Sequence, residues 1–284
     1  MMRVQIGRII RIITLTEGII IMAMAVKKTD IHTHILPGID DGAKNISESL
    51  ALLKEQKSQG VNQVIFTPHF RFKNNGNASK DIKEFIEKRD MSFKLLTENS
   101  SFKDFDISVK MGSEVYYSVD LSECIYFDEL CISGTSYLLI ELPTQIKPHG
   151  MKYVMSNLIN KGYIPVIAHI ERYSYIMDDP MLLYDLVEIG CLSQINAEVF
   201  IEKNKRVNIL KKMIKLGLVH FISSDCHSIE KRPPNLKQGY SEIQKKVGVK
   251  YLEMFDENSK LLFDNKIVES QNIREPINIL GVWV

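Results

Sequence analysis

The chain has 284 residues, of which 45% are hydrophobic and 25% charged, so it is long enough to bury a large core. Its formal net charge of +1 gives no reason to expect a nucleic acid or another polyanion as a partner. The four cysteines, Cys124, Cys131, Cys191 and Cys226, form no C-x-x-C pair and are typical of reduced thiols in a cytoplasmic protein.

Residues 1–25 differ in pattern from the rest of the chain. Three arginines precede the apolar run 19–25, as in a secretory signal sequence, but the run is too short to span a bilayer. Three interpretations stay open: a misassigned start with true initiation at Met22 or Met24, a weak signal sequence, or an added helix. We favour the first, and expect residues 1–25 to lie outside one domain formed by residues 26–284.

From residue 28 onward, strand-like and helix-like segments alternate. Apolar runs predict strands at 28–33, 61–67, 107–111, 137–140, 163–168, 191–195 and 219–223. Apolar residues at helical spacing predict one helix over 47–59, capped by Ser47 and ended by Gly60, and another over 81–97. Apolar strands separated by helices are typical of parallel strands that are buried on both faces.

The first strand carries two histidines and leads into an acidic turn. His32 and His34 are two residues apart, so both imidazoles leave the same face of an extended strand. The strand breaks at Pro37, and the turn that follows offers the carboxylates of Asp40 and Asp41. This order of ligands is typical of the beginning of metal-dependent hydrolases, the alternative being a solvated strand end with a polar turn.

A histidine, aspartate or glutamate follows nearly every predicted strand. The carboxyl ends of the strands in a parallel barrel converge on one mouth, so these side chains are expected to meet in space. They are His32, His34, Asp41, His69, Glu114, Glu141, His169, Asp225 and His227. Because five of the seven histidines stand at such positions, we predict a polynuclear metal site.

Six motifs resemble those of the PHP (polymerase and histidinol phosphatase) superfamily. Within it they are most similar to the bacterial manganese-dependent tyrosine-protein phosphatases of capsule and exopolysaccharide loci, the CpsB/CapC/YwqE type. The motifs are DIHTHILPGIDDG (30–42), TPH (67–69), GSEVYY (112–117), LIELP (139–143), IAHIERY (167–173) and SSDCH with Arg232 (223–232). Their order and spacing make the resemblance specific, and it covers most of the chain from residue 28 to about 240.

The resemblance implies an α/β fold, a distorted (β/α)7 TIM-like barrel, that holds three divalent ions. Manganese is the usual ion, with iron, magnesium or zinc as alternatives. One ion would take His32, His34, Glu114 and Asp225; a second would take Glu141 and His169 and share Glu114; the third would take Asp41, His69 and His227. Asp40 is an alternative to Asp41. Nitrogen and oxygen ligands of this kind suit manganese or iron.

The implied function is a manganese-dependent protein-tyrosine phosphatase that acts on a bacterial tyrosine kinase of polysaccharide biosynthesis. A metal-activated hydroxide would attack phosphorus, while Arg172 and Arg232 match the arginines that hold the phosphate. A small-molecule phosphoesterase such as a histidinol-phosphate phosphatase and a non-catalytic module that docks on a kinase are the alternatives. We expect a cytoplasmic enzyme without an integral membrane span, and leave its oligomeric state open.

Cys226 and Arg232 have the Cys-x5-Arg spacing of the cysteine-dependent tyrosine phosphatases. That mechanism needs a glycine-assisted phosphate loop around a thiolate of low pKa. No glycine lies between the two residues, and Pro233 and Pro234 follow them, so we favour coincidence.

Five other residues allow two interpretations each. His220 lies inside an apolar run and is expected to be a hydrogen-bonded structural histidine rather than a ligand. Glu171 is expected to contact a ligand without being one, and Asn196 either orients a ligand or serves as a cap. Tyr116 and Tyr117 either flank the mouth, where they could stack on an aromatic substrate, or belong to the core.

Overall fold

The computed structural model describes residues 13–15, 18–20, 28–73, 77–123, 127–202, 204–270, 272–279 and 282–283. The main strands are β3 (Lys28–Thr33), β4 (Val61–Phe66), β5 (His69–Phe70), β6 (Ser108–Met111), β7 (Glu114–Tyr116), β8 (Tyr137–Glu141), β9 (Ile164–Ile167), β10 (Leu192–Asn196) and β11 (Phe221–Ser223). The longer helices are α1 (Ile46–Ser58), α2 (Ala78–Thr97), α4 (Met151–Asn160), α6 (Met181–Glu188), α8 (Val207–Lys215), α9 (Leu236–Lys246) and α10 (Val249–Phe263).

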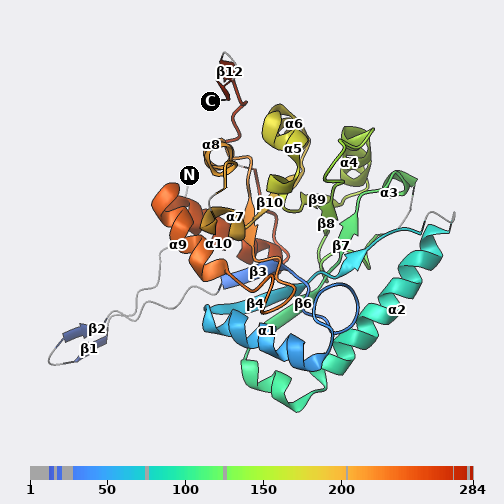
Figure 1. Cartoon of the computed structure of the whole chain (residues 1–284), viewed down its shortest axis with the longest axis vertical. Helices are drawn as coiled ribbons and strands as arrows, with labels where there is room; N and C mark the ends of the chain where they lie inside the picture. Colours follow the sequence, from blue (N-terminus) through green and yellow to red (C-terminus); the bar gives the residue numbers. More distant parts are fainter. Residues whose placement is uncertain are drawn as a thin grey trace, which may run out of the picture.

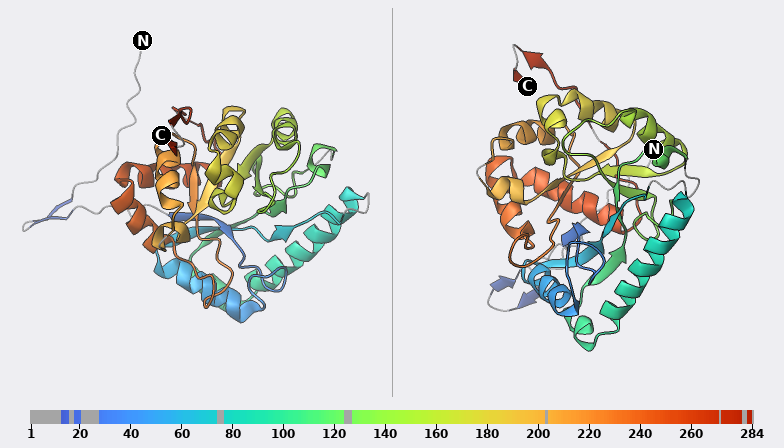
Figure 2. Two further views of the ribbon diagram at one scale, coloured as in Figure 1. Left: turned by 45° about the horizontal axis from the view of Figure 1, so that its top comes forward. Right: turned by 45° about the vertical axis from the view of Figure 1, so that its right-hand side comes forward.

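Several short elements complete the described fold. They are α3 (Asp120–Glu123), α5 (Ser174–Asp178), α7 (Glu198–Ile201), the 3-10 segments η1 (Ser100–Phe105) and η2 (Ile170–Arg172), and the strands β12 (Asn278–Ile279) and β13 (Val282–Trp283). The predicted alternation of strands and helices is therefore confirmed, and the helices lie around the outside of the strands (Figure 1; Figure 2).

Two parallel sheets carry the fold, in the orders β3-β4-β6 and β11-β10-β9-β8-β7-β5. The chain runs directly from β4 to β5 and from β6 to β7, so these strands pass from the first sheet into the second. At the other side, Asp225 N donates to His32 O (3.0 Å) and His34 N donates to Cys226 O (2.9 Å), which brings the segment after β11 beside β3. The strand order is thus cyclic, as in the predicted barrel. Among the described residues, however, the hydrogen-bonded strands are divided into two sheets.

An apolar cluster fills the space enclosed by the strands. Six strands contribute fully or almost fully buried side chains, among them Ile31, Ile65, Leu139, Val166, Leu192 and Phe221. Leu262 and Phe263, at the end of α10, pack into the same cluster. A second, larger cluster lies between the strands and the helices that cover them. Burial on both faces explains why the strands are continuous apolar runs rather than alternating ones.

The structure corrects two predictions, the residue that caps the first helix and the number of strands around residues 107–116. The side chain of Asn45, not Ser47, caps α1 and accepts from Glu48 N at 3.0 Å. The run predicted at 107–111 is followed by a further strand, β7, which the sequence analysis missed because Gly112 and Ser113 interrupt the apolar pattern.

In the N-terminal extension, β1 (Ile13–Leu15) pairs with β2 (Gly18–Ile20) as antiparallel strands. The added helix considered for residues 1–25 is therefore wrong for these six positions, and the rest of that stretch lies outside the described residues. The misassigned start and the signal sequence are not tested by this pairing.

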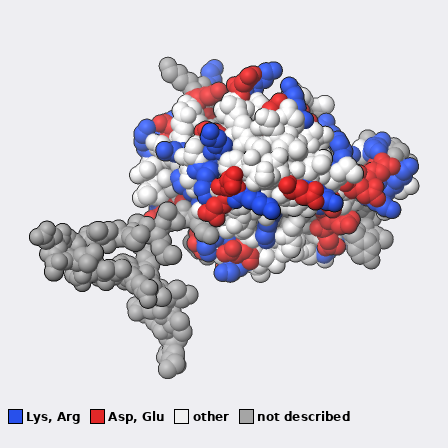
Figure 3. Space-filling model, turned by 90° about the horizontal axis from the view of Figure 1, so that it is seen from below, with Lys and Arg blue, Asp and Glu red and all other residues white. Residues whose placement is uncertain are grey.

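The described surface carries both signs of charge. On the face shown in Figure 3, basic and acidic side chains are interspersed, in keeping with the net charge of +1. Among the described helices, none combines the length and the apolar character that a membrane span requires.

Asp30 connects β3 to α1 and to the segment after β11. Its fully buried carboxylate accepts from Ser224 N (3.0 Å), from the Ser224 hydroxyl and from Gln56 Nε2 (2.6 Å). We expect Asp30→Ala to lower the free energy of unfolding by roughly 3 kcal/mol, because it leaves these buried donors unpaired. Urea unfolding of the metal-free protein measures this value.

Asp41→Ala is the matched control, since the Asp41 side chain is 67% exposed. It should change the free energy of unfolding by less than about 0.5 kcal/mol. Equal stabilities of the two variants would contradict the structural role of Asp30.

Candidate metal centre

All nine residues predicted from the strand ends lie in one cluster. Glu114, Asp225 and Asp41 connect its parts. Glu114 contacts His32, His34, His69 and His169. Asp225 contacts His32, His34 and His227, and Asp41 contacts His69 and His227. Glu141 lies 3.9 Å from His69 and His169. The convergence expected for parallel strands is therefore present in the fold.

Glu114 is the centre of the cluster. Its side chain is 1% exposed, and its Oε2 lies 3.2 Å from His32 Nε2 and 3.1 Å from His34 Nε2, while its Oε1 lies 2.8 Å from His169 Nε2. Burial alone would raise the pKa of Glu114, but the charge of His32 and the hydrogen bonds of the surrounding histidines lower it well below its usual range. The carboxylate is therefore ionised at neutral pH.

Three overlapping groups in the cluster could each hold a metal ion. Within each group the candidate ligand atoms lie within 4.8 Å of one another: His34, Asp41, His69 and His227; His32, His34 and Asp225; and His69, Glu114 and Glu141. Three buried atoms that face the cluster, Glu114 Oε2, Asp225 Oδ1 and His69 Nδ1, lie close to other members of the cluster but make no hydrogen bond of good geometry. Unsatisfied electron-pair donors of this kind fit a bound cation. His169 belongs to none of these groups, although its Nε2 lies 2.8 Å from Glu114 Oε1. How the nine residues are divided among individual ions stays a prediction.

Four histidines are held by a hydrogen bond at Nδ1. The partners are Gln194 Oε1 for His32 (3.3 Å), Asp40 Oδ2 for His34 (2.7 Å), Tyr173 Oη for His169 (3.1 Å) and the carbonyl of Asp225 for His227 (2.9 Å). A proton on Nδ1 satisfies each of these contacts, so loss of a proton from Nε2 would make its lone pair available to a metal ion. This is the arrangement by which proteins orient metal-ligating histidines.

The two adjacent aspartates of the acidic turn have different surroundings. Asp40 is almost fully buried and accepts from His34 Nδ1, from Gly42 N (2.9 Å) and from His69 N (3.0 Å). Asp41 is mostly exposed, and its Oδ1 lies 3.4 Å from His69 Nε2 and 3.5 Å from His227 Nε2. Asp41 therefore faces the cluster, whereas Asp40 orients two of its histidines.

Two residues that position the site were not given this role from the sequence. Gln194 lies on β10, where its Oε1 contacts His32 and accepts from His169 N (2.8 Å). The signal that could have identified Gln194 is an amide side chain inside an otherwise apolar strand. Tyr173 lies in a recognised motif, but its contact with His169 depends on the 3-10 turn η2, which spacing alone does not reveal.

Asn196 and Glu171 line the same side of the cluster. Asn196 Nδ2 donates to Asp225 Oδ2 (2.8 Å), so of its two predicted roles the orienting one is confirmed. Glu171 Oε1 accepts from Asn196 N (3.2 Å), and burial raises the pKa of Glu171 to about 7. Glu171 therefore supports a residue that orients Asp225 and belongs to none of the three candidate groups.

Two of the nine residues have left-handed backbone conformations. His169, directly after Ala168 and β9, has φ 31°, and Asp225, shortly after β11, has φ 52°. Side chains other than glycine rarely adopt this region, and they keep it only where the surroundings hold them there. Here Gln194 Oε1 accepts from His169 N, and His32 O accepts from Asp225 N. The turned backbone directs both side chains into the cluster.

Arg172 and Arg232 both reach Asp225. Each donates to its Oδ2, Arg172 at 2.6 Å, and Arg232 Nη1 lies 2.9 Å from His227 Nε2. Their side chains are 33% and 30% exposed, so both extend from the buried cluster to solvent. Burial opposes ionisation of Asp225, but His32 and the two arginines hold its pKa well below the usual range.

Cys226 and His220 do not belong to the centre. Cys226 is fully buried, its Sγ contacts Gln56 Nε2 (3.5 Å), and burial raises the pKa of its thiol to about 12. A thiol of that pKa is not a nucleophile at neutral pH, so the coincidence favoured from the sequence is supported. His220 is bonded to Ser193 N (3.1 Å) and the Ser270 hydroxyl (2.8 Å), and the structural role predicted for it is confirmed.

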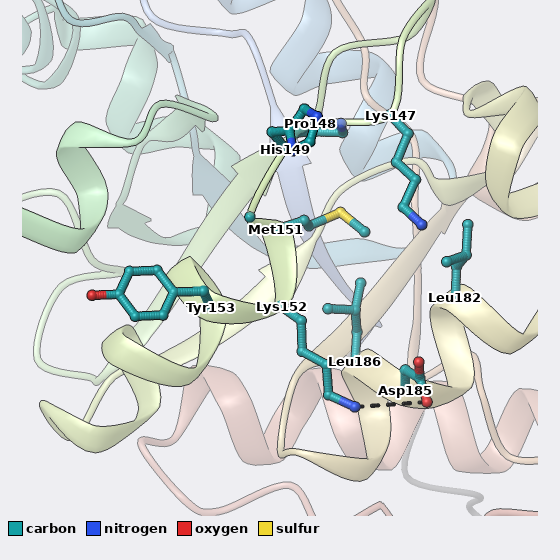
Figure 4. Close-up of a pocket in the computed structure, with 10 residues that line it drawn as sticks. Lys147, Pro148, His149, Met151, Lys152, Tyr153, Leu182, Asp185 and Leu186 are labelled. Atoms are coloured by element: carbon teal, nitrogen blue, oxygen red, sulfur yellow. Dashed lines mark ion pairs between the residues drawn. The ribbon is translucent and has the colours of Figure 1, made fainter.

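A separate pocket of about 530 Å³ lies between α4 and α6 (Figure 4). Its lining includes Lys147, His149, Met151 and Leu182, and an ion pair of 3.7 Å joins Lys152 and Asp185. None of the nine residues of the cluster lines it.

The fold and the cluster place the chain among the α/β proteins that carry a histidine–carboxylate centre at the carboxyl ends of parallel strands. The family model described as "Capsular polysaccharide synthesis, CpsB/CapC" matches residues 28–264, so the chain belongs to the CpsB/CapC family.

Comparison with known proteins supports this family assignment. CapC of Staphylococcus aureus is 36% identical over 245 residues, covering 85% of this chain and 93% of its own. The tyrosine-protein phosphatase YwqE of Bacillus subtilis is 32% identical over 250 residues, covering 85% and 94%. A crystal structure from a study of YwqE and of CpsB from Streptococcus pneumoniae, described as unique metal-dependent tyrosine phosphatases, matches with a TM-score of 0.74 at 30% identity, covering 87% of this chain and 98% of that one.

Gly42 allows the acidic turn to approach β3. A Cβ at this position would lie 2.1 Å from His34 O and 2.6 Å from His34 Cβ, and backbone at such distances must move. We expect Gly42→Ala to displace Asp40 and Asp41 and to weaken manganese binding at least about tenfold, since loss of the groups that orient ligands has this effect. Titration calorimetry of the metal-free protein measures the change.

Gly60→Ala serves as the control. Gly60 has a positive φ, 82°, and nothing lies within 4 Å of its added Cβ. This variant should lose some stability and keep its affinity for manganese. Equal affinities in the two variants would refute the role assigned to Gly42.

Proposed function

We propose that this chain is a metal-dependent protein-tyrosine phosphatase, a phosphoric monoester hydrolase. The observation that carries the proposal is a buried histidine–carboxylate cluster with unpaired donor atoms, beside which two arginines extend to solvent. The names of the relatives support it, because YwqE and CpsB are called tyrosine-protein phosphatases.

The position of each group of residues determines its proposed role. Divalent ions held by the nine residues would supply positive charge at the phosphoryl group and lower the pKa of water. Arg172 and Arg232 would bind the phosphate oxygens, since a planar guanidinium suits bidentate contact with phosphate. Asp225 fixes both arginines at the edge of the cluster. A tyrosine leaves as a phenolate with a pKa of about 10, which reduces the need for a general acid.

We propose manganese as the native ion, with iron, magnesium or zinc as alternatives. The donors are imidazole nitrogens and carboxylate oxygens, a set that suits manganese and iron better than a metal that demands thiolates. Cys226 lies nearby in sequence, but its Sγ contacts Gln56 and belongs to none of the candidate groups.

The proposed substrate is a phosphorylated tyrosine in a protein, specifically a bacterial tyrosine kinase of polysaccharide biosynthesis. The family description, capsular polysaccharide synthesis, supports this partner. We also propose that residues 26–284 form one domain, because the cluster joins residues as far apart as His32 and His227, and that this domain is cytoplasmic.

Metal removal tests the proposed chemistry. Chelation of the purified protein should abolish hydrolysis of a phosphotyrosine peptide, and added manganese should restore it, because the ligands cannot act without the ion. His32→Ala should lower turnover by orders of magnitude, since it removes one donor of the cluster. Release of phosphate measures the rate, and elemental analysis measures the metal content.

Cys226→Ser is the matched control for the alternative cysteine mechanism. The buried serine is close in size and should leave most of the turnover, whereas a cysteine nucleophile would make this variant inactive. Full turnover by the metal-free protein, or an inactive serine variant with its full metal content, would refute the proposal.

The two arginines permit a separate test. Arg172→Ala and Arg232→Ala should each lower turnover roughly 100-fold, as expected for loss of one group that stabilises transition-state charge. The metal content should stay nearly unchanged, because neither arginine supplies a ligand. Arg→Lys should restore little, since lysine lacks the planar fork. A variant that loses its metal ions would show that the arginine instead maintains Asp225.

A further inference from the structure

Arg71 and Tyr116 form a cation–π pair beside the metal centre, and neither belongs to the nine-residue cluster or to the two phosphate-binding arginines. The guanidinium carbon of Arg71 lies 4.1 Å from the centre of the Tyr116 ring. One of its nitrogens, Nη2, lies 3.4 Å from Glu141 Oε2, and the side chain is 60% exposed. Arg71 therefore connects the buried cluster with the surface.

The register of the strands explains where the pair lies. His69 of β5 is paired with Glu114 of β7, and both belong to the cluster. Arg71 and Tyr116 each follow one of these residues by two positions, which places them on the same face, one step nearer the carboxyl ends of the strands. The pair thus forms the layer directly outside the ligands.

An ion pair with Glu141 does not account for the arrangement of Arg71. The contact is long and made by a mostly exposed side chain, and such pairs contribute little to stability. The guanidinium carbon instead lies over the Tyr116 ring, while more than half of the side chain stays accessible. A planar cation held in this way can stack on a second aromatic ring.

The neighbouring tyrosine does not share this position. Tyr117 is buried, and its hydroxyl donates to the His149 carbonyl at 3.0 Å, so of its two predicted roles the core is confirmed. The partly exposed Tyr116 is left as the aromatic side chain that supports Arg71.

We propose that Arg71 and Tyr116 form the binding surface for the aromatic ring of the substrate, and so select aryl over alkyl phosphomonoesters. The inference rests on the proposed phosphatase function. Arg172 and Arg232 hold the phosphate on the Asp225 side of the cluster, and Arg71 stands on the Glu141 side. The ring of a bound aryl phosphate then packs on the exposed part of the Arg71 guanidinium.

Two phosphonates with the same head group test the inference without turnover. Phenylphosphonate carries an aromatic ring, methylphosphonate does not, and calorimetry gives the affinity of the manganese-loaded protein for each. The wild type should prefer phenylphosphonate, and Arg71→Ala should weaken its binding about tenfold while changing methylphosphonate binding less than about twofold. Tyr116→Leu should have a similar but smaller effect, and Tyr116→Phe, which keeps the ring, should bind like the wild type.

Arg71→Lys separates stacking from charge. If the ring stacks on the planar guanidinium, lysine does not restore the preference for phenylphosphonate. Equal losses of both phosphonates in Arg71→Ala, with recovery of both by lysine, would make Arg71 a phosphate-binding residue and overturn the inference. A lower manganese content in Arg71→Ala would overturn it in favour of a role in positioning Glu141.

The proposed function and this inference can be refuted independently of each other. A wild type that hydrolyses phosphotyrosine peptide with manganese, but binds the two phosphonates equally, keeps the function and loses the inference. A wild type that neither hydrolyses the peptide nor binds either phosphonate removes both.

Discussion

The site depends on one ionised carboxylate that is almost completely removed from water. A buried charge is costly unless nearby groups compensate it, and Glu114 meets this requirement through contacts with four histidines. Even so, Glu114 Oε2 and Asp225 Oδ1 are left without a hydrogen-bond partner of good geometry. The lone pairs of these oxygens make the cluster complementary to cations.

Much of this site was predictable because parallel strands place their carboxyl ends together. Most of the nine residues directly follow an apolar run, so His169 and Glu114, 55 positions apart, could be assigned to one site without a structure. Spacing could not decide between Asp40 and Asp41, because both belong to one turn and only its close approach to His34 separates their roles. Gln194 escaped prediction for a different reason. A glutamine within an apolar run gives no indication that its oxygen meets two histidines.

The fold separates the rigid part of the molecule from the reactive part. Side chains from six strands and from the end of α10 fill the interior with apolar atoms, and the polar cluster lies at the carboxyl ends of the same strands. A side chain in the cluster can hardly shift without disturbing a packed layer, since protein interiors are close-packed. This support suits a site whose ligands must keep their geometry while a charged substrate enters and leaves.

The contact between Asp30 and Ser224 joins positions 194 residues apart and has a consequence for how the protein matures. His32 and His34 leave the ribosome early, but Asp225 and His227 complete the cluster only after most of the chain has been made. Contacts of such long sequence separation form late in folding, because they require the intervening chain to be ordered. A nascent or truncated chain that ends before β11 therefore lacks the complete centre. Binding of metal ions at the full cluster then indicates that synthesis has passed β11.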